Sequence, residues 1–514
     1  MLIVGSMRDF YNKLCLLILE EHFGPLIKCI GNNLLHGTKT LRAICFGTRL
    51  PLAKVKEGLC VLIKYGYVTC QQIEEDDTIE YSLDHDKIIM ILRYPSITCC
   101  YRYMFFTKTY CGDEGEIMLE EILKHGYLTA SEVIIKTYKR VEKASNKSDE
   151  DVSLPNLKDA FELLVKNQFL MRSVSFDTAA KETEKPDYNL PELDLRAIHY
   201  MMQGQEADPG DGKVYWKVNV DRFTQDFRDQ IVVSAMTQRF NDSAGKLMRQ
   251  LINLMYVRTA SWSDTSNPIP YTEIKEAVKK LDCPELEQYL DQYLQMMEED
   301  SSQFVRRVGD SGGGQYSINM KNAFKQLAWV TLENIVTERF GSKAARIFRL
   351  VRMDSGVTLE QIQQMAMIPA KEAKFFAYTL VQENYIQIQE LKKGGSSAVD
   401  SRKASFRFCI DLPTVVEMEM EHCCQALYNI IQRRSHESTS NRRMIEKQLR
   451  VQILSANMRE HGATEQQLAD IADMMTPSEN EQLEKAQKAI KGLAAAEFHI
   501  DETLFLLTMY VRYH

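Results

Sequence analysis

The 514-residue sequence lacks the motifs that many catalytic classes require. It contains no Gly-x-x-x-x-Gly-Lys-Ser/Thr phosphate loop, no Gly-x-Gly-x-x-Gly fingerprint behind a strand and no His-Glu-x-x-His zinc motif. The ten histidines are scattered along the chain. We therefore expect no catalytic residues, no bound metal and no cofactor.

The twelve cysteines include no Cys-x-x-Cys pair. Cys15, Cys29 and Cys60 lie in apolar helical stretches, where a reduced thiol behaves as a small hydrophobic residue, so we expect core positions. The adjacent pairs at 99–100 and 423–424 lack further ligands at metal spacing. This pattern favours a reducing compartment, the cytosol or the nucleus.

Long apolar runs and an excess of positive charge are also missing. No stretch approaches the roughly 20 apolar residues that span a bilayer, and Arg8 and Asp9 interrupt the apolar residues 1–4, so we expect a chain that is neither secreted nor membrane-spanning. Lys and Arg total 63 against 71 Asp and Glu, a net charge of -8 that argues against coating nucleic acid indiscriminately. Any nucleic-acid contact should be local, and the length predicts several domains.

What the sequence does contain is a repeated unit. Residues 62–68, 164–170 and 380–386 share an ending of two aliphatic residues, a polar stretch, an aromatic and an aliphatic residue. An amphipathic helix pattern precedes each ending, and alternating, β-prone sequence follows it. A proline lies near the start of each of these helices: Pro51, Pro155 and Pro369. A threonine begins a shorter helix upstream in each unit: Thr40, Thr129 and Thr358. The last two threonines have capping-box spacing. This order is that of the winged helix-turn-helix.

A more diverged unit fits residues 213–320, with wing strands expected at 304–305 and 316–318. The glycine-rich stretch 309–314 between them resembles the loop around the nucleophile of trypsin-like serine proteases, with Ser311 in the place of the nucleophile. That chemistry requires a two-barrel β fold and an upstream histidine, which a mainly helical chain does not offer. We therefore predict a glycine-rich wing turn.

From about Pro413 the pattern changes to long helices. Ile445, Leu449 and Ile453 form one apolar stripe, and residues 483–493 carry heptad spacing. Both patterns predict an antiparallel helical hairpin or short coiled coil, with burial in a larger core as the alternative. The region is rich in methionine, which suits adaptable packing or a partner surface.

The predicted fold is mainly α with small β-wings: tandem winged helix-turn-helix domains followed by a C-terminal antiparallel coiled coil. The expected segments are winged helix 1 at 7–86, winged helix 2 at 87–178, a charged linker with room for a short helix at 179–212, winged helix 3 at 213–320, winged helix 4 at 321–413 with its wing tip at 392–405, and the helical hairpin at 414–514.

Two groups of basic residues are candidates for contact with DNA phosphates. The first surrounds the third helix of the first unit and the second lies in the C-terminal region: Arg49, Lys54, Lys56 and Lys64; Arg433, Arg434, Arg442 and Arg443. The alternative is that these are ordinary solvated charges, because 26% of the residues are charged.

Several segments resemble a known family. Residues 214–223, Val-Tyr-Trp-Lys-Val-Asn-Val-Asp-Arg-Phe, are the most specific, and the others extend over the chain: 92–95, 227–229, 309–314, 338–342, 345–349, 367–373 and 501–503. They resemble the large winged-helix subunit of RNA polymerase III. The linker at 179–212 departs from family members with a longer, more basic insertion, which leaves a nuclear-import or DNA role for that segment open.

The resemblance implies a non-catalytic nuclear subunit, similar to the large subunit of transcription factor IIE. Its implied partners are a smaller winged-helix subunit and an acidic-tailed subunit, which together form a heterotrimer on the polymerase clamp, as well as transcription factor IIIB and promoter DNA, duplex or melted. The implied role is promoter recruitment and opening for transfer RNA, 5S RNA and other short transcripts, with a link to sensing of cytosolic DNA. The competing hypothesis is a free-standing winged-helix regulator, which should carry base-reading Arg, Asn or Gln on a third helix.

Overall fold

The computed structural model describes residues 9–72, 78–93, 102–144, 153–173, 188–205, 207–212, 214–281, 283–354, 356–391, 405–460, 466–467 and 474–514. The chain folds into two compact units, one made of residues 9–225 and 427–498 and the other of residues 226–426 and 499–514. None of the helices in the described part combines the length and apolarity that crossing a membrane requires. The predicted class, mainly helical with small antiparallel sheets, is confirmed.

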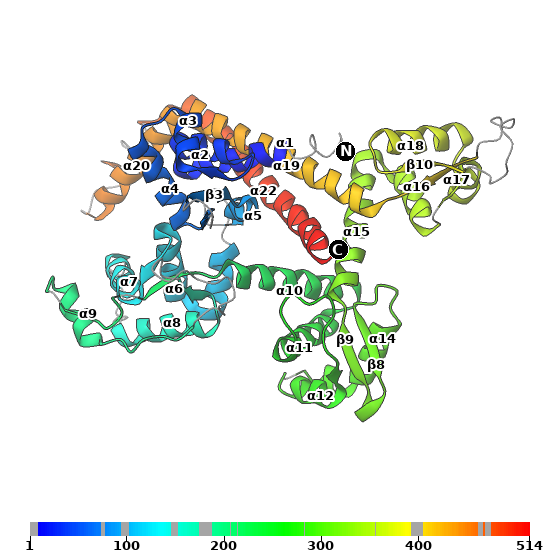
Figure 1. Ribbon diagram of the computed structural model, residues 1–514, viewed down its shortest axis with the longest axis horizontal. Helices are drawn as coiled ribbons and strands as arrows, with labels where there is room; N and C mark the ends of the chain where they lie inside the picture. Colours follow the sequence, from blue (N-terminus) through cyan, green and yellow to red (C-terminus); the bar gives the residue numbers. More distant parts are fainter. Residues whose placement is uncertain are drawn as a thin grey trace. The chain divides into compact units, whose positions relative to one another are not determined.

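The first winged helix lies in the unit formed by residues 9–225 and 427–498 (Figure 1). Its three-stranded sheet has the order β1-β3-β2 and is entirely antiparallel. Val55, Leu59 and Leu62 of α4 are buried, as their spacing predicts. The elements are α1 (Asp9–Phe23), α2 (Pro25–Leu34), β1 (Lys39–Thr40), α3 (Leu41–Thr48), α4 (Leu52–Lys64), β2 (Val68–Gln72), β3 (Ile79–Leu83), α5 (His85–Ile89) and the 3₁₀ helix η1 (Met90–Arg93).

The second winged helix belongs to the same unit. Thr129 and Glu132 form the predicted capping box at the start of α7, each backbone N–H donating to the other side chain. Gly112, with φ 75°, kinks α6. The elements are α6 (Arg102–His125), β4 (Leu128–Thr129), α7 (Ala130–Ala144), α8 (Leu154–Lys166), β5 (Leu170–Arg172), α9 (Leu195–Met202) and β6 (Tyr215–Val218).

The sheet of this second domain corrects the predicted boundary at residue 213. Its order is β4-β6-β5, so β6, which we assigned to the third unit, is the central strand of the second. Trp216 of β6 is fully buried and its ring packs edge-on against Phe161 of α8, with the ring centres 5.8 Å apart. The predicted linker 179–212, including α9, is therefore an insertion between the two wing strands.

The third winged helix belongs to the unit formed by residues 226–426 and 499–514. This unit begins within its first helix, α10, at Asp226. The predicted wing strands are present and pair in a sheet of order β7-β9-β8. The elements are α10 (Val220–Arg239), α11 (Asp242–Arg258), β7 (Ile269–Pro270), α12 (Tyr271–Lys279), α13 (Pro284–Gln288), α14 (Leu290–Glu299), β8 (Val305–Gly309), the 3₁₀ turn η2 (Ser311–Gly313) and β9 (Gln315–Ile318).

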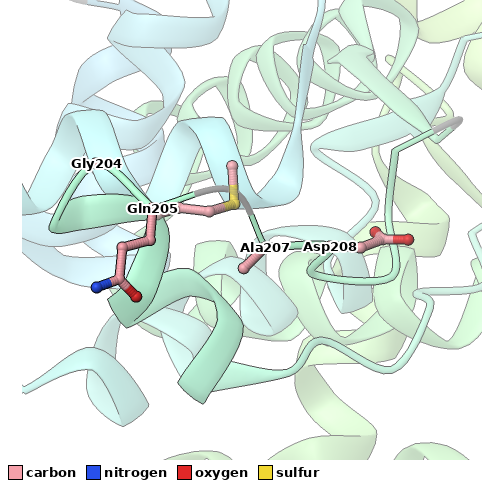
Figure 2. A pocket seen from close by; sticks show the side chains of 5 residues that line it. Gly204, Gln205, Ala207 and Asp208 are labelled. Atoms are coloured by element: carbon pink, nitrogen blue, oxygen red, sulfur yellow. The ribbon is translucent and has the colours of Figure 1, made fainter.

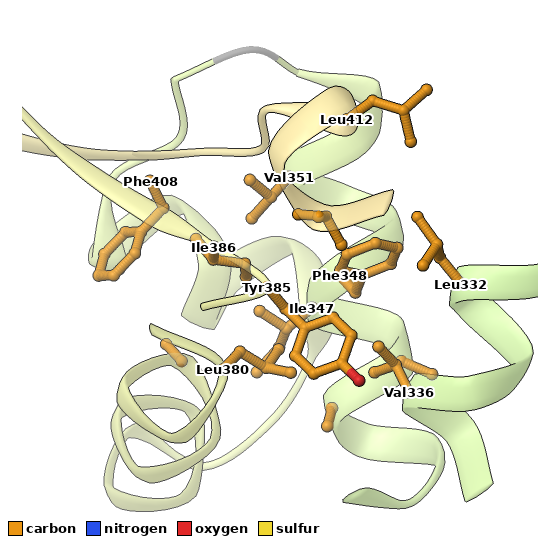
Figure 3. Close-up of a cluster of buried hydrophobic side chains, with 14 of the residues drawn as sticks. Leu332, Val336, Ile347, Phe348, Val351, Leu380, Tyr385, Ile386, Phe408 and Leu412 are labelled. Atoms are coloured by element: carbon orange, nitrogen blue, oxygen red, sulfur yellow. The ribbon is translucent and has the colours of Figure 1, made fainter. Parts of the chain in front are cut away.

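The fourth winged helix belongs to the same unit as the third. Its core contains Phe348 of α16, Leu380 of α18, Tyr385 just before β10, and Phe408 of β11 (Figure 3). Thr358 and Gln361 form the predicted capping box. The elements are α15 (Met320–Phe340), α16 (Ser342–Met353), α17 (Leu359–Ala366), α18 (Ala370–Gln382), β10 (Gln387–Leu391) and β11 (Ser405–Cys409). The rest of the expected wing tip, 392–404, lies outside the described residues.

One backbone conformation explains the shared ending of the repeats. After the last helix of each winged helix, one residue has positive φ: Gly66 at 75°, Gln168 at 62°, Gln303 at 48° and Asn384 at 62°. This left-handed residue reverses the chain and lets a later N–H reach back to the helix. The N–H of Tyr67, for example, donates to the carbonyl of Leu62 at 2.9 Å. The aromatic residue that follows the left-handed residue is buried in each domain, which explains why an aromatic residue recurs at this position of the repeat.

The C-terminal region consists of α19 (Leu412–Ser440), α20 (Arg442–Glu460) and α22 (Pro477–Tyr513). In the unit formed by residues 9–225 and 427–498, α19 and α20 run antiparallel to α22, as three contacts show: Arg434 with Glu497, Lys447 with Glu479 and Gln448 with Gln487. The predicted helical hairpin is therefore present.

The two predicted apolar stripes of the hairpin differ in burial. Leu483 and Ala486 of α22 are buried, but Leu449 and Ile453 of α20 are 55% and 52% exposed. The prediction that the α20 stripe packs in the hairpin was wrong, because Lys447 and Gln448 occupy the side that faces α22.

The cysteines are only partly in the predicted positions. Cys15, Cys423 and Cys424 are buried, and burial raises the pKa of the Cys15 and Cys423 thiols to about 12. Cys29 and Cys60 are exposed, so the prediction of core positions was wrong for these two. They lie on the outward sides of α2 and α4, although apolar residues surround them in sequence. The pair 99–100 lies outside the described residues.

Candidate nucleic-acid interface

The third helix of the first winged helix, α4, presents two candidate residues to solvent. The buried Val55, Leu59 and Leu62 fix one side of α4 against the domain core, which leaves Lys54 and Lys56 exposed. Neither lysine forms an ion pair within the described ranges of the chain. Two uncompensated ammonium groups on the helix that enters the groove in this domain class make a suitable contact for DNA phosphates.

Arg49 and Lys64 lie at either end of the same helix-turn-helix. Arg49 caps the end of α3 with φ 56°, and its side chain is exposed. Lys64 is in the last turn of α4, where its ammonium group lies 4.9 Å from the centre of the Tyr127 ring in the second winged helix. Arg49, Lys54 and Lys56 are thus all exposed on the first winged helix, with Lys54 and Lys56 on opposite flanks of the buried Val55, whereas Lys64 contacts a neighbouring domain.

The C-terminal candidates do not form a single basic surface. Arg433 pairs with Glu437 at 2.6 Å and Arg442 with Glu446 at 2.8 Å, both one helical turn away. The hydrogen bond to Glu446 raises the pKa of Arg442. Arg443 is exposed and forms no ion pair with any residue that the structure describes. Of this group, it is the candidate with an uncompensated charge.

Arg434 is placed differently from its neighbours. Its side chain is 5% exposed, and its guanidinium donates to Glu497 at 2.6 Å and to Glu21 at 2.7 Å. A buried guanidinium that is bonded to two carboxylates, one of them buried, is not available to a phosphate. We therefore withdraw Arg434 as a DNA contact and assign it to the packing of α19 against α22 and α1.

One further exposed surface, on the third helix of the fourth winged helix, was not among the candidates predicted from the sequence. Lys371, Lys374, Phe375 and Tyr378 of α18 are all exposed. Their spacing of three, four and seven residues places them on one side of the helix. That spacing was visible in the sequence, but the exposure of two aromatic residues was not.

Two further features of the described residues bear on the sequence analysis, the glycine-rich turn of the third winged helix and a pocket at the end of α9. Ser311 accepts a hydrogen bond from the Gln315 side chain at 2.9 Å across the wing turn, in keeping with the predicted turn. A pocket at the end of α9 is lined by Met201, Gly204, Gln205, Ala207 and Asp208, and its two polar side chains point apart (Figure 2). Among the described residues, no three His, Cys, Asp or Glu side chains gather as metal ligands.

Comparison with known families matches nearly every part of this architecture. The family models are RNA polymerase III subunit RPC82 helix-turn-helix domain at residues 13–70, RNA polymerase III subunit RPC82 at 133–327, the C-terminal winged-helix domain of POLR3C at 332–406, and the helical hairpin domain of DNA-directed RNA polymerase III subunit RPC3 at 443–506.

Similar full-length proteins carry the same description. DNA-directed RNA polymerase III subunit RPC3 of Homo sapiens is 34% identical over 97% of this chain and 98% of its own length. The subunit RPC3 proteins of Rattus norvegicus and Danio rerio show the same identity and coverage. The order of winged helices and the terminal hairpin thus agree with the matches along the whole sequence, and the chain belongs to the RPC3 family of RNA polymerase III subunits.

Proposed function

We propose that this chain is a non-catalytic subunit of DNA-directed RNA polymerase III that acts during initiation in the nucleus. The observation that carries the proposal is the similarity to RPC3 subunits over 97% of the chain. We assign it to a three-subunit subcomplex on the clamp of the largest subunit, together with a smaller winged-helix subunit and an acidic-tailed subunit. The exposed stripe of α20 and the methionine-rich C-terminal region are suitable surfaces for such partners.

Within this assembly, the chain binds promoter DNA through the first winged helix. Lys54 and Lys56 are exposed on the two flanks of α4 and carry uncompensated charge among the described residues, with Arg49 nearby in sequence. Contacts of this kind position a protein on the phosphate backbone without reading the bases. They suit a polymerase that must act at many different promoters.

Promoter opening requires no active site in this subunit. Binding that favours melted DNA over duplex is sufficient to shift the equilibrium toward the open promoter. The proposed role is therefore promoter recruitment, contact with transcription factor IIIB and promoter opening for transfer RNA, 5S RNA and other small RNAs. Recognition of cytosolic DNA by the polymerase is a further proposed setting for the same contacts.

The test is DNA binding by the full-length chain with both lysines replaced. We expect Lys54→Gln together with Lys56→Gln to weaken binding to a labelled duplex and to reduce the slope of log affinity against log salt by about 1.8, because each lost phosphate contact removes about 0.9. The matched control is Lys488→Gln with Lys491→Gln on exposed positions of α22. Unchanged affinity and slope in the Lys54 and Lys56 variant would exclude α4 as the contact.

The alternative of a free-standing sequence-specific regulator is not favoured by the exposed side chains. The outward positions of α4 carry lysine, alanine, leucine, glutamate and cysteine, and those of α18 carry lysine and aromatic residues. Direct readout of bases relies mainly on bidentate Arg, Asn or Gln contacts. The surface of these two helices is thus better suited to backbone contact or stacking than to recognition of an operator.

A further inference from the structure

Thr476, at the start of α22, has a sequence context that no other residue of the chain shares. It is the only serine or threonine of the 514 residues that directly precedes a proline, Pro477. A serine or threonine followed by proline is the substrate sequence of the proline-directed protein kinases. The Thr476 side chain is exposed, as are those of Pro477 and Ser478.

The Thr476 side chain caps α22 together with Glu479. Its hydroxyl accepts the Glu479 backbone N–H at 3.3 Å and donates to the Glu479 carboxylate at 3.1 Å, and that carboxylate accepts the Thr476 N–H at 3.0 Å. This reciprocal arrangement is a capping box. Pro477 suits the first helical position, which needs no N–H. The cap accounts for these residue types, but it does not require the cation that lies beside it.

This cation comes from the other arm of the hairpin. The Lys447 ammonium group of α20 donates to Glu479 Oε2 at 2.8 Å, and the same oxygen bonds the Thr476 hydroxyl. The hydrogen bond from Lys447 lowers the pKa of Glu479 to about 2, so the carboxylate is charged at neutral pH. The Lys447 side chain is 38% exposed. The Thr476 hydroxyl therefore lies close to an ammonium group and to the N–H groups of a helix start, the two kinds of partner that a phosphate group binds.

The position at a helix end also gives a kinase access to the hydroxyl. A kinase holds the residues around its target in an extended conformation, so a target in the middle of a helix has to be unfolded first. The terminal turn of a helix opens at a much lower free energy than its middle. Thr476 precedes the first turn of α22, so only this turn has to open.

We propose that Thr476 is a phosphorylation site for a proline-directed protein kinase, and that the phosphate group replaces Glu479 in the cap of α22 and pairs with Lys447. In the transfer, the hydroxyl oxygen bonds to the γ-phosphorus of ATP, the bond from that phosphorus to ADP breaks, and the hydroxyl proton passes to the base of the kinase. The phosphate carries a charge of about -1.5 to -2 and repels the Glu479 carboxylate, which therefore leaves the cap. This modification goes beyond the proposed function and does not depend on it.

The experiment purifies the tagged full-length chain from cells with phosphatases inhibited and examines the peptide containing residue 476 by mass spectrometry. We expect phosphate on Thr476 and its loss in Thr476→Ala. Pro477→Ala keeps the hydroxyl and a helix-compatible residue but should also lose the phosphate, because the kinase requires the proline. The matched control is Ser478→Ala, which should be phosphorylated as the unaltered chain is. Recovery of this peptide without phosphate, or with equal phosphate in Pro477→Ala, overturns the proposal.

Hydrogen exchange of the amides at 478–480 tests the exchange of caps. In the chain treated with phosphatase, Glu479→Ala should accelerate exchange, because the capping carboxylate is lost. In the phosphorylated chain the same substitution should have no effect, because the phosphate holds the cap. Glu481→Ala is the control, since Glu481 pairs with Lys485 along the same helix and should leave exchange unchanged in both forms.

Equal acceleration by Glu479→Ala in both forms would show that Glu479 keeps its place, and faster exchange on phosphorylation alone would show that the phosphate opens the turn. Either result overturns the proposed cap. Neither readout involves DNA binding or the recovery of polymerase subunits, so failure here is distinguishable from failure of the proposed function.

Discussion

Arg433 and Arg434 are neighbours in sequence with opposite surroundings. The Arg433 side chain is 63% exposed and pairs along its own helix, whereas the Arg434 side chain is 5% exposed and joins α19 to α22 and α1 through Glu497 and Glu21. A charge inside a protein is tolerated only when it is paired and hydrogen-bonded. The same residue type thus has a structural role at one position and a solvent-exposed role at the next.

This contrast gives a stability prediction. Arg434→Ala leaves the buried carboxylate of Glu497 without its cation, so we expect a loss of about 3 to 5 kcal/mol in the free energy of unfolding of this part of the chain. The control Arg433→Ala removes an exposed pair one turn apart and should cost less than about 1 kcal/mol. Denaturant unfolding followed by circular dichroism measures both. Equal effects of the two substitutions would contradict the structural role of Arg434.

The insertion between β5 and β6 of the second winged helix supplies an N-terminal cap to α7, which lies far away in sequence. Asp211 is buried, and its carboxylate accepts hydrogen bonds from the Ser131 backbone N–H at 2.7 Å and the Ser131 hydroxyl at 3.0 Å, at the start of α7. A carboxylate at a helix N-terminus satisfies an N–H that the helix leaves unpaired. The insertion therefore stabilises α7 as well as leading the chain into the central strand β6.

We expect Asp211→Ala to destabilise the first turn of α7 by about 1 to 3 kcal/mol, because hydrogen bonds to a charged group are lost from a buried site. Hydrogen exchange of the amides at 130–134 should accelerate accordingly. Asp208→Ala is the control, since the exposed Asp208 accepts a bond from Gly210 within its own turn. Unaltered protection of α7 in the Asp211 variant would show that the cap contributes nothing.

The sequence predicted those elements whose signals are local. The apolar spacing of α4, the capping boxes at Thr129 and Thr358 and the common ending of the repeats all lie within a few residues of one another. The partner of β5 was not predictable in this way, because Arg172 pairs with Trp216 across the insertion. The assignment of residues 213–218 to the third domain followed from reading strands in sequence order.

The same limit applies to the candidate site. Exposure of Lys54 and Lys56 follows from the helix period, but the partners of Arg434 lie 63 and 413 residues away in sequence. Periodicity also identified the stripe containing Leu449 and Ile453 without telling which side of α20 meets α22. Long-range pairing, which decides burial, is the information that a single sequence does not carry.

Across the whole molecule, the net charge of -8 bears on how the protein can contact nucleic acid. Three of the four C-terminal candidates are paired with carboxylates, and the uncompensated basic residues among the described candidates lie at Arg49, on α4 and at Arg443. An acidic protein with a few local basic surfaces is suited to being positioned by protein partners before it contacts nucleic acid. This charge distribution is what we expect of an assembly subunit whose contacts with DNA are few and local.

The central claim is tested most directly by native purification of the tagged full-length chain from cells at its normal level, followed by quantitative mass spectrometry. We expect the two largest subunits of RNA polymerase III, the smaller winged-helix subunit and the acidic-tailed subunit in amounts equal to that of the chain. Recovery of the chain free of these subunits, or with subunits unique to another polymerase, would contradict the account.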